Sequence, residues 1–299
     1  MIKTWKDIMA EARFVKRHKI VVAGAEDILI LKALRDAVDL GLIEPILVGN
    51  KQELKRCCRE LSLTDWPLIE AGSAEIAEVA VRLVRSTPGA LLMKGRISTA
   101  DLMKAVLNRQ TGIRTNRLLS HVAAVETSGY HKLLFITDGA INLRPDTDTL
   151  EGITTNVIEL VRRFGIDHPR TALIALVESV NPRIKSTQTA HEIAIRFSNQ
   201  LIEGPLSLDI ALSTAAAQVK DFSSRIAGET DILVMPNATS CNVVVKALRL
   251  VGGAKIGGVV LGAQIPIILV SRSDDANSKL RSIVLSVTYQ EKLNSYNAS

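Results

Sequence analysis

The sequence predicts an α/β protein in which helices cover sheets of mostly parallel strands. Short apolar runs alternate with longer segments whose apolar residues recur at helical spacing, and this rhythm is typical of parallel sheets. Hydrophobic residues make up 47% of the chain but aromatic residues only 3%, which suits an aliphatic interior on both faces of a sheet. A chain of 299 residues is expected to form one large or two moderate domains.

The N-terminal part of the chain repeats the strand–helix unit four times. Gly41 is expected to end the first helix in the position that glycine fills best, and Ser73 is expected to cap the third helix. The expected strands are 19–24, 44–50, 66–71 and 90–95, and the expected helices are 26–41, 51–61, 73–86 and 98–107.

Two strand candidates, 120–127 and 132–139, follow each other without a helix between them, which suggests a hairpin or a sheet edge. The alternation then resumes, and it fits two α/β lobes that meet near residue 140. We expect residues 1–138 and about 273–299 in the first lobe and about 139–272 in the second. The later expected strands are 170–178, 201–204, 231–236, 257–262 and 266–271, and the helices are 150–165, 187–200, 241–250 and others starting at Ser207 and about Asp274.

The formal net charge of +6 indicates either a solvated basic surface or a partner that bears phosphates. Basic residues between positions 13 and 19 lie on a helical pattern without interleaved aromatic residues. Stacking of single-stranded bases is therefore not expected, and no nucleic-acid partner is predicted.

The predicted compartment is the cytoplasm. No apolar run reaches the roughly 18 residues of a membrane span, and the N-terminus lacks the apolar core of a signal peptide. Cys57, Cys58 and Cys241 show no metal-binding spacing, and an odd number of cysteines suggests a reducing environment. We therefore predict no membrane contact.

Common nucleotide, metal and hydrolase motifs are missing. The stretch 22–27 follows a strand but lacks G-x-G-x-x-G, and the glycine-rich stretch 252–264 lacks Gly-Lys-Ser/Thr. No two histidines are spaced i, i+4 with a glutamate between them, so no metal site is predicted. G-x-S-x-G is also absent, which leaves a Ser-His-Asp hydrolase unsupported.

The segment 266–280 carries the strongest candidate for a site. Ser271 and Arg272 come at the carboxyl end of an expected buried strand, where open α/β sheets bind ligands. Asp274 and Asp275 then open a helix. Either aspartate is explained as an N-cap that stabilises the helix by about 1 kcal/mol. A hydroxyl, an arginine fork and a carboxylate at one strand end equally suit an anionic substrate whose reaction needs a base.

Other polar side chains follow expected strands at comparable places. Each alone is explained as a loop or surface residue, but together they predict a cleft that the two lobes share. These residues are Lys94, Arg96, Asp138, Asn142, Asn237, Asn242 and Lys246.

Several stretches in this order closely resemble the phosphate acetyl/butyryltransferase family, nearer to its butyryl branch. The likeness covers nearly the whole chain. It implies two isocitrate-dehydrogenase-like α/β lobes with an interlobe cleft, a homodimer or larger homo-oligomer, and catalysis without NAD or metal. The stretches are LLMKGRISTADLMKAVL, SHVAAVE, LLFITDGAIN, VESVNPRIKSTQTA, EGPLSLDIALS, DILVMPNATSCNVVVKAL and PIILVSRSDD.

The resemblance implies the reaction acyl-CoA + phosphate = acyl phosphate + CoA, for a short chain such as butyryl, with acetyl as the other option. CoA and phosphate are then substrates, and no tightly bound cofactor is expected. The family's Ser-Arg pair matches Ser271 and Arg272, and its catalytic aspartate corresponds to Asp274 or Asp275. The cations assigned to the phosphates of CoA are Lys94, Arg96 and Lys104.

Two positions depart from the family pattern. Glu203 replaces the aspartate of the usual Asp-Gly-Pro, and Cys241 replaces a glycine before Asn242. Both affect the expected substrate size more than the reaction. Two alternative functions are an NAD- or metal-dependent dehydrogenase of the same fold class and a non-catalytic regulator that binds acyl-CoA. The first lacks its nucleotide loop and metal set, and the second is disfavoured by the intact Ser-Arg-Asp set.

Overall fold

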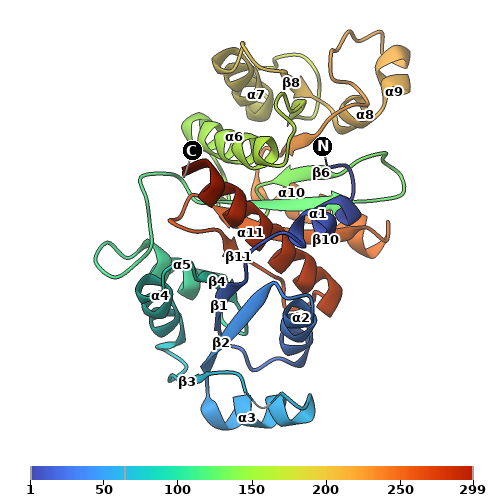
Figure 1. The fold of residues 1–299 in the computed structure, drawn as a ribbon. Helices are drawn as coiled ribbons and strands as arrows, with labels where there is room; N and C mark the ends of the chain where they lie inside the picture. Colours follow the sequence, from blue (N-terminus) through green and yellow to red (C-terminus); the bar gives the residue numbers. More distant parts are fainter. Residues whose placement is uncertain (1, 64, 298–299) are drawn as a thin grey trace. The chain divides into compact units, whose positions relative to one another are not determined.

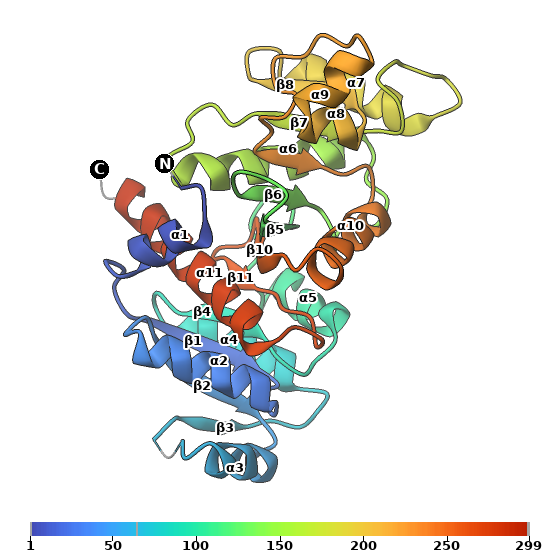
Figure 2. The same ribbon diagram turned by 90° about the vertical axis from the view of Figure 1, so that its right-hand side faces the viewer.

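The computed structural model describes residues 2–63 and 65–297, and the chain divides into two compact units. Lys6–Arg117 and the chain from Gly257 onward form one unit, called the N-terminal unit below. The chain through Trp5 and Leu118–Ile256 form the other, called the middle unit. Figures 1 and 2 label most helices and strands of both units.

The N-terminal unit contains strands in the order β3-β2-β1-β4-β11-β10. All neighbours among them are parallel except β10 and β11. The strands are β1 (His18–Ala23), β2 (Ile43–Gly49), β3 (Leu68–Glu70), β4 (Leu91–Lys94), β10 (Lys255–Leu261) and β11 (Ile267–Ile268). The helices are α1 (Trp5–Ala12), α2 (Ile28–Asp39), α3 (Lys51–Glu60), α4 (Ile76–Ser86), α5 (Thr99–Leu107) and α11 (Ala276–Asn297).

Helices cover both faces of this sheet. Figure 2 shows α2 and α11 in front of the strands and α4 and α5 behind them. The last helix, α11, packs against α2 and β11, so the C-terminal segment lies in the same unit as the first strands. Most residues of the central strands are buried, and Val21, Leu47 and Leu92 have no exposed surface.

The middle unit contains strands in the order β5-β6-β9-β7-β8. The consecutive strands β5 and β6 form an antiparallel hairpin, which is one of the two arrangements expected from the sequence, and the remaining neighbours are parallel. The strands are β5 (Ser120–Glu126), β6 (Leu134–Thr137), β7 (Thr171–Ile174), β8 (Ile202–Leu206) and β9 (Ile232–Val234), and the helices are α6 (Thr147–Arg163), α7 (Lys185–Arg196), α8 (Leu208–Leu212), α9 (Thr214–Val219) and α10 (Ala238–Leu250).

The predicted α/β class with mostly parallel strands is therefore confirmed. The compact units change over after Arg117 and Ile256, whereas the sequence placed boundaries near residues 139 and 272. The difference arises at the hairpin, because β6 pairs with β9 through Phe135, Ile136 and Thr137, which keeps both hairpin strands with the middle of the chain.

Local signals in the sequence were correct at one helix end and wrong at another. Gly41 has φ +75° and donates to Val38 O, while Leu42 N–H donates to Ala37 O, which is the predicted glycine-terminated helix end. Ser73 does not cap α4. The helix begins at Ile76 after a turn, and Glu75 occupies the cap position without a side-chain hydrogen bond.

The N-terminal segment also differs from expectation. Helix α1 was not predicted, and the basic residues at 13–19 follow it in a turn and in β1 instead of lying on a helix. Across residues 2–63 and 65–297, no helix combines the length and the apolar character needed to cross a membrane.

Candidate active site

The chain turns between β11 and α11 over residues 271–275, which we call the Arg272 turn. Ser271 and Arg272 are exposed there, and Asp274 N–H donates to Ser271 O at 3.1 Å. Within the described parts of the chain, the Arg272 guanidinium makes no hydrogen bond or ion pair. Its donors are therefore available to a ligand.

The two aspartates of the turn have different structural tasks. Asp275 Oδ1 accepts from Ser278 N–H at 2.6 Å, so Asp275 is the N-cap of α11, as one of the two sequence interpretations proposed. Asp274 Oδ2 accepts from Ser271 N–H at 2.7 Å. Asp274 thereby fixes the backbone that presents Ser271 and Arg272.

The buried side chain of Lys279 also stabilises the Arg272 turn. Lys279 lies in the first turn of α11 and is 1% exposed. Its ammonium donates to Ser271 O at 3.3 Å and also to Asp274 O. Lys279 was not among the residues predicted from the sequence. The signal was present, because Lys279 occupies the same helix face as the buried Ile283 and Val287.

A second buried cation, Lys94, lies at the end of β4 with 4% of its surface exposed. Burial lowers the pKa of its ammonium, and the positive charges of Arg272 and Lys279 lower it further. Asp274 acts in the opposite direction. Within the described residues, Lys94 Nζ makes one hydrogen bond, to Gly95 O at 3.3 Å. Lys94, Arg272 and Lys279 therefore form a cationic centre that favours an anion.

Close backbone packing places Lys94 in this centre. Gly95 N–H donates to Ala23 O at 2.9 Å, and a Cβ on Gly95 would lie 2.0 Å from Gly24 O. Only glycine fits such an approach of the β1 and β4 ends. Arg96, next in the chain, is exposed and donates to Glu26 O at 3.4 Å.

Lys104 shares its pocket with none of the other predicted site residues. It is exposed on α5 and lines a small pocket of about 110 Å³ together with Glu78 and Asp101. The negative charges of these two acidic side chains disfavour binding of the CoA phosphates by Lys104. Its assignment stays a prediction from the sequence.

In the middle unit, Asp138 organises the loop 138–142 that follows β6, which we call the Asp138 loop. The carboxylate is 2% exposed. Oδ1 accepts from Ala140 and Ile141 N–H at 2.9 and 3.0 Å. Oδ2 accepts from the backbone and side-chain amides of Asn142 at 3.1 and 2.8 Å. Asp138 therefore fixes the backbone of residues 140–142.

Residues of α10 approach this loop. Asn242 Nδ2 donates to Gly139 O at 3.2 Å, which places Asn242 beside the Asp138 loop. Lys246, one turn further along the helix, is exposed. Asn237 is the N-cap of α10 and accepts from Ser240 N–H at 2.9 Å.

The two departures from the family pattern have local explanations. Cys241 is fully buried, and its sulfur would lie 3.1 Å from a Cβ on Gly139. Burial, followed by the charge of Asp138, raises the pKa of its thiol. Glu203 lies in β8, where its carboxylate accepts from Ser224 Oγ at 2.6 Å and from the Arg225 backbone and side chain, both at 3.0 Å.

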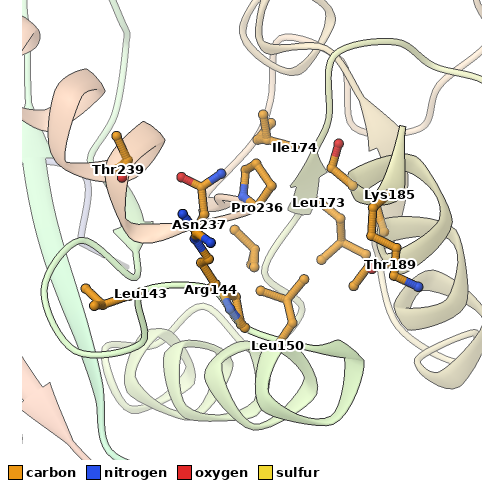
Figure 3. Close-up of a pocket in the computed structure, with 14 residues that line it drawn as sticks. Leu143, Arg144, Leu150, Leu173, Ile174, Lys185, Thr189, Pro236, Asn237 and Thr239 are labelled. Carbon is orange, nitrogen blue, oxygen red and sulfur yellow. The ribbon is translucent and has the colours of Figure 1, made fainter. Parts of the chain in front are cut away.

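A pocket of about 500 Å³ opens beside Asn237 in the middle unit. Figure 3 shows Pro236, Leu173 and Leu150 at its centre, with Thr239 of α10 on one side and Lys185 and Thr189 of α7 on the other. Of the residues predicted from sequence, Asn237 belongs to its lining. The basic lining residues Arg144 and Lys185 were not singled out, because neither directly follows a strand.

The chain matches the model of the family described as "Phosphate acetyl/butaryl transferase" over residues 70–287. Phosphate butyryltransferase of Clostridium acetobutylicum is 35% identical over 294 residues, which cover 95% of this chain and 97% of that protein. Phosphate acetyltransferase of Rhizobium meliloti is also 35% identical, with 94% and 92% covered.

A solved structure agrees with these relatives. The branched-chain phosphotransacylase from Enterococcus faecalis V583 superposes with a TM-score of 0.80 at 32% identity, covering 91% of this chain and 99% of that one. The chain therefore belongs to the phosphate acetyl/butyryl transferase family and is an acyltransferase.

Proposed function

We propose that this protein transfers a short acyl group between CoA and inorganic phosphate, with butyryl or a chain of similar length as the acyl group. Family membership supports the reaction class. The observation that carries the assignment of the site is Arg272, an exposed guanidinium without a protein partner in the described chain, beside the buried cations Lys94 and Lys279. Such a centre suits a phosphate-bearing substrate.

In the direction of acyl-CoA synthesis, the CoA thiol attacks the carbonyl carbon of the acyl phosphate. A free thiol has a pKa of roughly 8.5 and is mostly protonated at neutral pH, so a carboxylate that accepts its proton speeds the attack. We assign this task to Asp274, because its carboxylate contacts the Ser271 backbone at 2.7 Å beside the proposed oxyanion groups, whereas the carboxylate of Asp275 caps α11. The carbon–sulfur bond forms, and the carbonyl oxygen becomes an oxyanion.

Ser271 and Arg272 are the groups we assign to that oxyanion and to the phosphate. When the tetrahedral intermediate collapses, the bond from carbon to the phosphate oxygen breaks, and inorganic phosphate leaves with the electron pair. The proton on Asp274 passes to phosphate or solvent. Removing one preorganised donor to an oxyanion typically raises the barrier by about 2.7–4 kcal/mol.

A covalent acyl-enzyme is not part of the proposal. Cys241 is the cysteine next to the predicted site residues, but it is fully buried and the pKa of its thiol is raised by burial. Both properties disfavour the reactive thiolate. Direct transfer between the two substrates therefore accounts for the reaction with the fewest steps.

The wider setting is proposed from the family resemblance. We propose two isocitrate-dehydrogenase-like lobes with an interlobe cleft to which Arg272 and Asp138 both contribute, and a cytoplasmic homodimer or larger homo-oligomer. We also propose catalysis without a tightly bound cofactor, NAD or metal. Activity that is lost on dialysis against EDTA and restored by a divalent metal would contradict this last point.

A thiol assay tests the proposed function directly. Purified protein is mixed with CoA and butyryl phosphate, and free thiol is measured with a colorimetric disulfide reagent. We expect thiol to disappear in proportion to enzyme, with release of one phosphate per thiol consumed. Reactions without enzyme and with the Arg272→Ala variant are the controls. Thiol levels that match the enzyme-free control for every acyl phosphate from acetyl to hexanoyl would contradict the proposal.

A further inference from the structure

The pocket beside Asn237 has a rigid apolar floor. Leu150, Leu173 and Val234 line it and are 4%, 1% and 1% exposed. Each is anchored in a regular element: Leu150 in α6, Leu173 in β7 and Val234 in β9. A surface of this kind offers a hydrocarbon chain a preformed apolar contact, and each buried methylene is worth a several-fold gain in affinity.

The rim of the pocket is positively charged. Arg144 and Lys185 belong to the lining, and no acidic side chain does. In the described chain neither cation makes a hydrogen bond or ion pair. Lys185 also begins α7, whose cap residue Ile184 supplies no side-chain hydrogen bond. The pocket therefore suits a ligand with an apolar end and an anionic end.

The substrates of the proposed reaction have this character, because a short hydrocarbon chain is joined to a phosphate-bearing group in both acyl phosphate and acyl-CoA. The pocket volume of about 500 Å³ lies within the range of roughly 300–1,000 Å³ found for small-molecule sites.

We infer that this pocket binds the acyl chain, with Leu150, Leu173 and Val234 as its floor, and that it makes the enzyme prefer chains longer than acetyl. The inference rests on the proposed function and assigns it a site for chain-length selection. The positive charges of Arg144 and Lys185 attract the negatively charged substrate to the rim, while the transferred phosphate stays assigned to Arg272.

Filling the pocket tests the inference. Ser186 lines it, is half-buried and makes no hydrogen bond within the described chain, so Ser186→Leu narrows the pocket without removing a contact. Thr239→Leu narrows it from the α10 side. Gln188→Leu is the control, since Gln188 lies on the same helix outside the lining; its hydrogen bond from Nε2 to Pro182 O at 3.1 Å is lost, and the melting temperature registers that loss.

The readout is the ratio of kcat/KM for butyryl phosphate to that for acetyl phosphate. We expect a ratio of at least about 10 in the unmodified enzyme. Ser186→Leu and Thr239→Leu should lower it at least about fivefold, whereas Gln188→Leu should leave it unchanged. Melting temperatures show whether Ser186→Leu or Thr239→Leu fails to fold. If one of them does, the ratio measured for the other one tests the inference.

Two results would overturn the inference. One is an unchanged ratio in both folded variants. The other is an equal loss for all chain lengths, which would place another part of the substrate in the pocket. Failure of the proposed function looks different, because no acyl phosphate would then react with CoA at all.

Charge variants show which substrate the rim recognises. Arg144→Gln and Lys185→Gln should raise KM for acyl phosphate or for acyl-CoA at least about threefold while the chain-length ratio stays constant. Arg183→Gln, an exposed arginine outside the lining, is the control. Unchanged KM for both substrates in both variants would overturn the role of the rim.

Discussion

The Arg272 turn and the Asp138 loop both follow strands and both carry charged side chains, but they use those charges differently. Asp138 is buried, and both of its carboxylate oxygens accept hydrogen bonds from amides of its own loop. Arg272 is exposed and binds no described residue, although two further cations lie beside it. The comparison teaches that hydrogen bonds separate a side chain that is fully engaged with its own loop, such as Asp138, from one whose donors remain available to a substrate, such as Arg272.

The largest effect should come from removing the free guanidinium. We expect Arg272→Ala to lower kcat about 10²–10³-fold, because both the charge and the donors to the oxyanion are lost. The melting temperature should stay within about 2 °C, since an unpartnered exposed side chain contributes little to the core. Steady-state kinetics and a thermal melt of the same sample check both. A variant that unfolds would show that Arg272 has a structural task.

In contrast to Arg272→Ala, the substitution Asp138→Ala should lower the stability of the folded protein. Three backbone N–H groups and the Asn142 amide lose their acceptor, so we expect the free energy of unfolding to fall by about 2–4 kcal/mol. Urea denaturation measures the loss. Asp146→Ala is the control, because Asp146 caps α6 through one hydrogen bond at 2.9 Å and should cost about 1 kcal/mol. Equal losses in the two variants would argue against the organising role of Asp138.

Asp274 and Asp275 in the Arg272 turn are expected to differ in the same way, since one is assigned to act on the substrate and the other stabilises the fold. Asp274→Asn should lower kcat about 100-fold if Asp274 accepts the thiol proton. Asp275→Ala should instead lower the free energy of unfolding by about 1 kcal/mol, because α11 loses its cap, with kcat within about twofold. Kinetics and urea denaturation of both variants decide. Reversed effects would assign the base role to Asp275.

The smallest effect concerns Lys94 and depends on pH. Its pKa in the folded protein is lowered by burial and by Arg272 and Lys279, so the folded protein holds this proton less well than the unfolded chain does. The resulting destabilisation is fully present below the folded-state pKa and disappears as pH rises through the ordinary lysine value of 10.5.

Lys94→Met should therefore raise the melting temperature slightly at pH 7 while lowering activity, and the gain should shrink as pH approaches 10. Melts at pH 7, 8.5 and 10 measure this trend. Lys104→Met, at an exposed position on α5, should show no such trend. A stability loss for Lys94→Met at pH 7 would mean that Lys94 has a structural partner worth more than the cost of its burial.

Most of the architecture was predictable because strand and helix periods are local properties of the sequence. The alternation gave the order of strands and helices, and the missing helix between 120–127 and 132–139 correctly indicated the hairpin. The start of α4 was not predictable from Ser73, since a turn closed by Gly72 O takes the place of a side-chain cap. Helix α1 was missed because its eight residues are short and its N-terminal signals are weak.

The candidate site was predictable only in part. Position at strand ends indicated Lys94, Asp138 and Arg272, because that rule depends on sheet topology alone. It did not separate Asp274 from Asp275, since both satisfy the pattern of a helix start. Nor did it reveal Lys279, whose task depends on two backbone carbonyls that only the folded turn brings together.

The most direct test of the account is Arg272→Lys, which keeps the charge but removes the planar fork. We expect kcat/KM for phosphate to fall at least about tenfold, because one transition-state hydrogen bond to a charged group is worth on the order of 1.5–3 kcal/mol. The melting temperature should be unchanged, as it should be for the control Arg183→Lys. A folded Arg272→Lys enzyme with unaltered kcat and unaltered KM for phosphate would contradict the central claim that this guanidinium acts on the substrate.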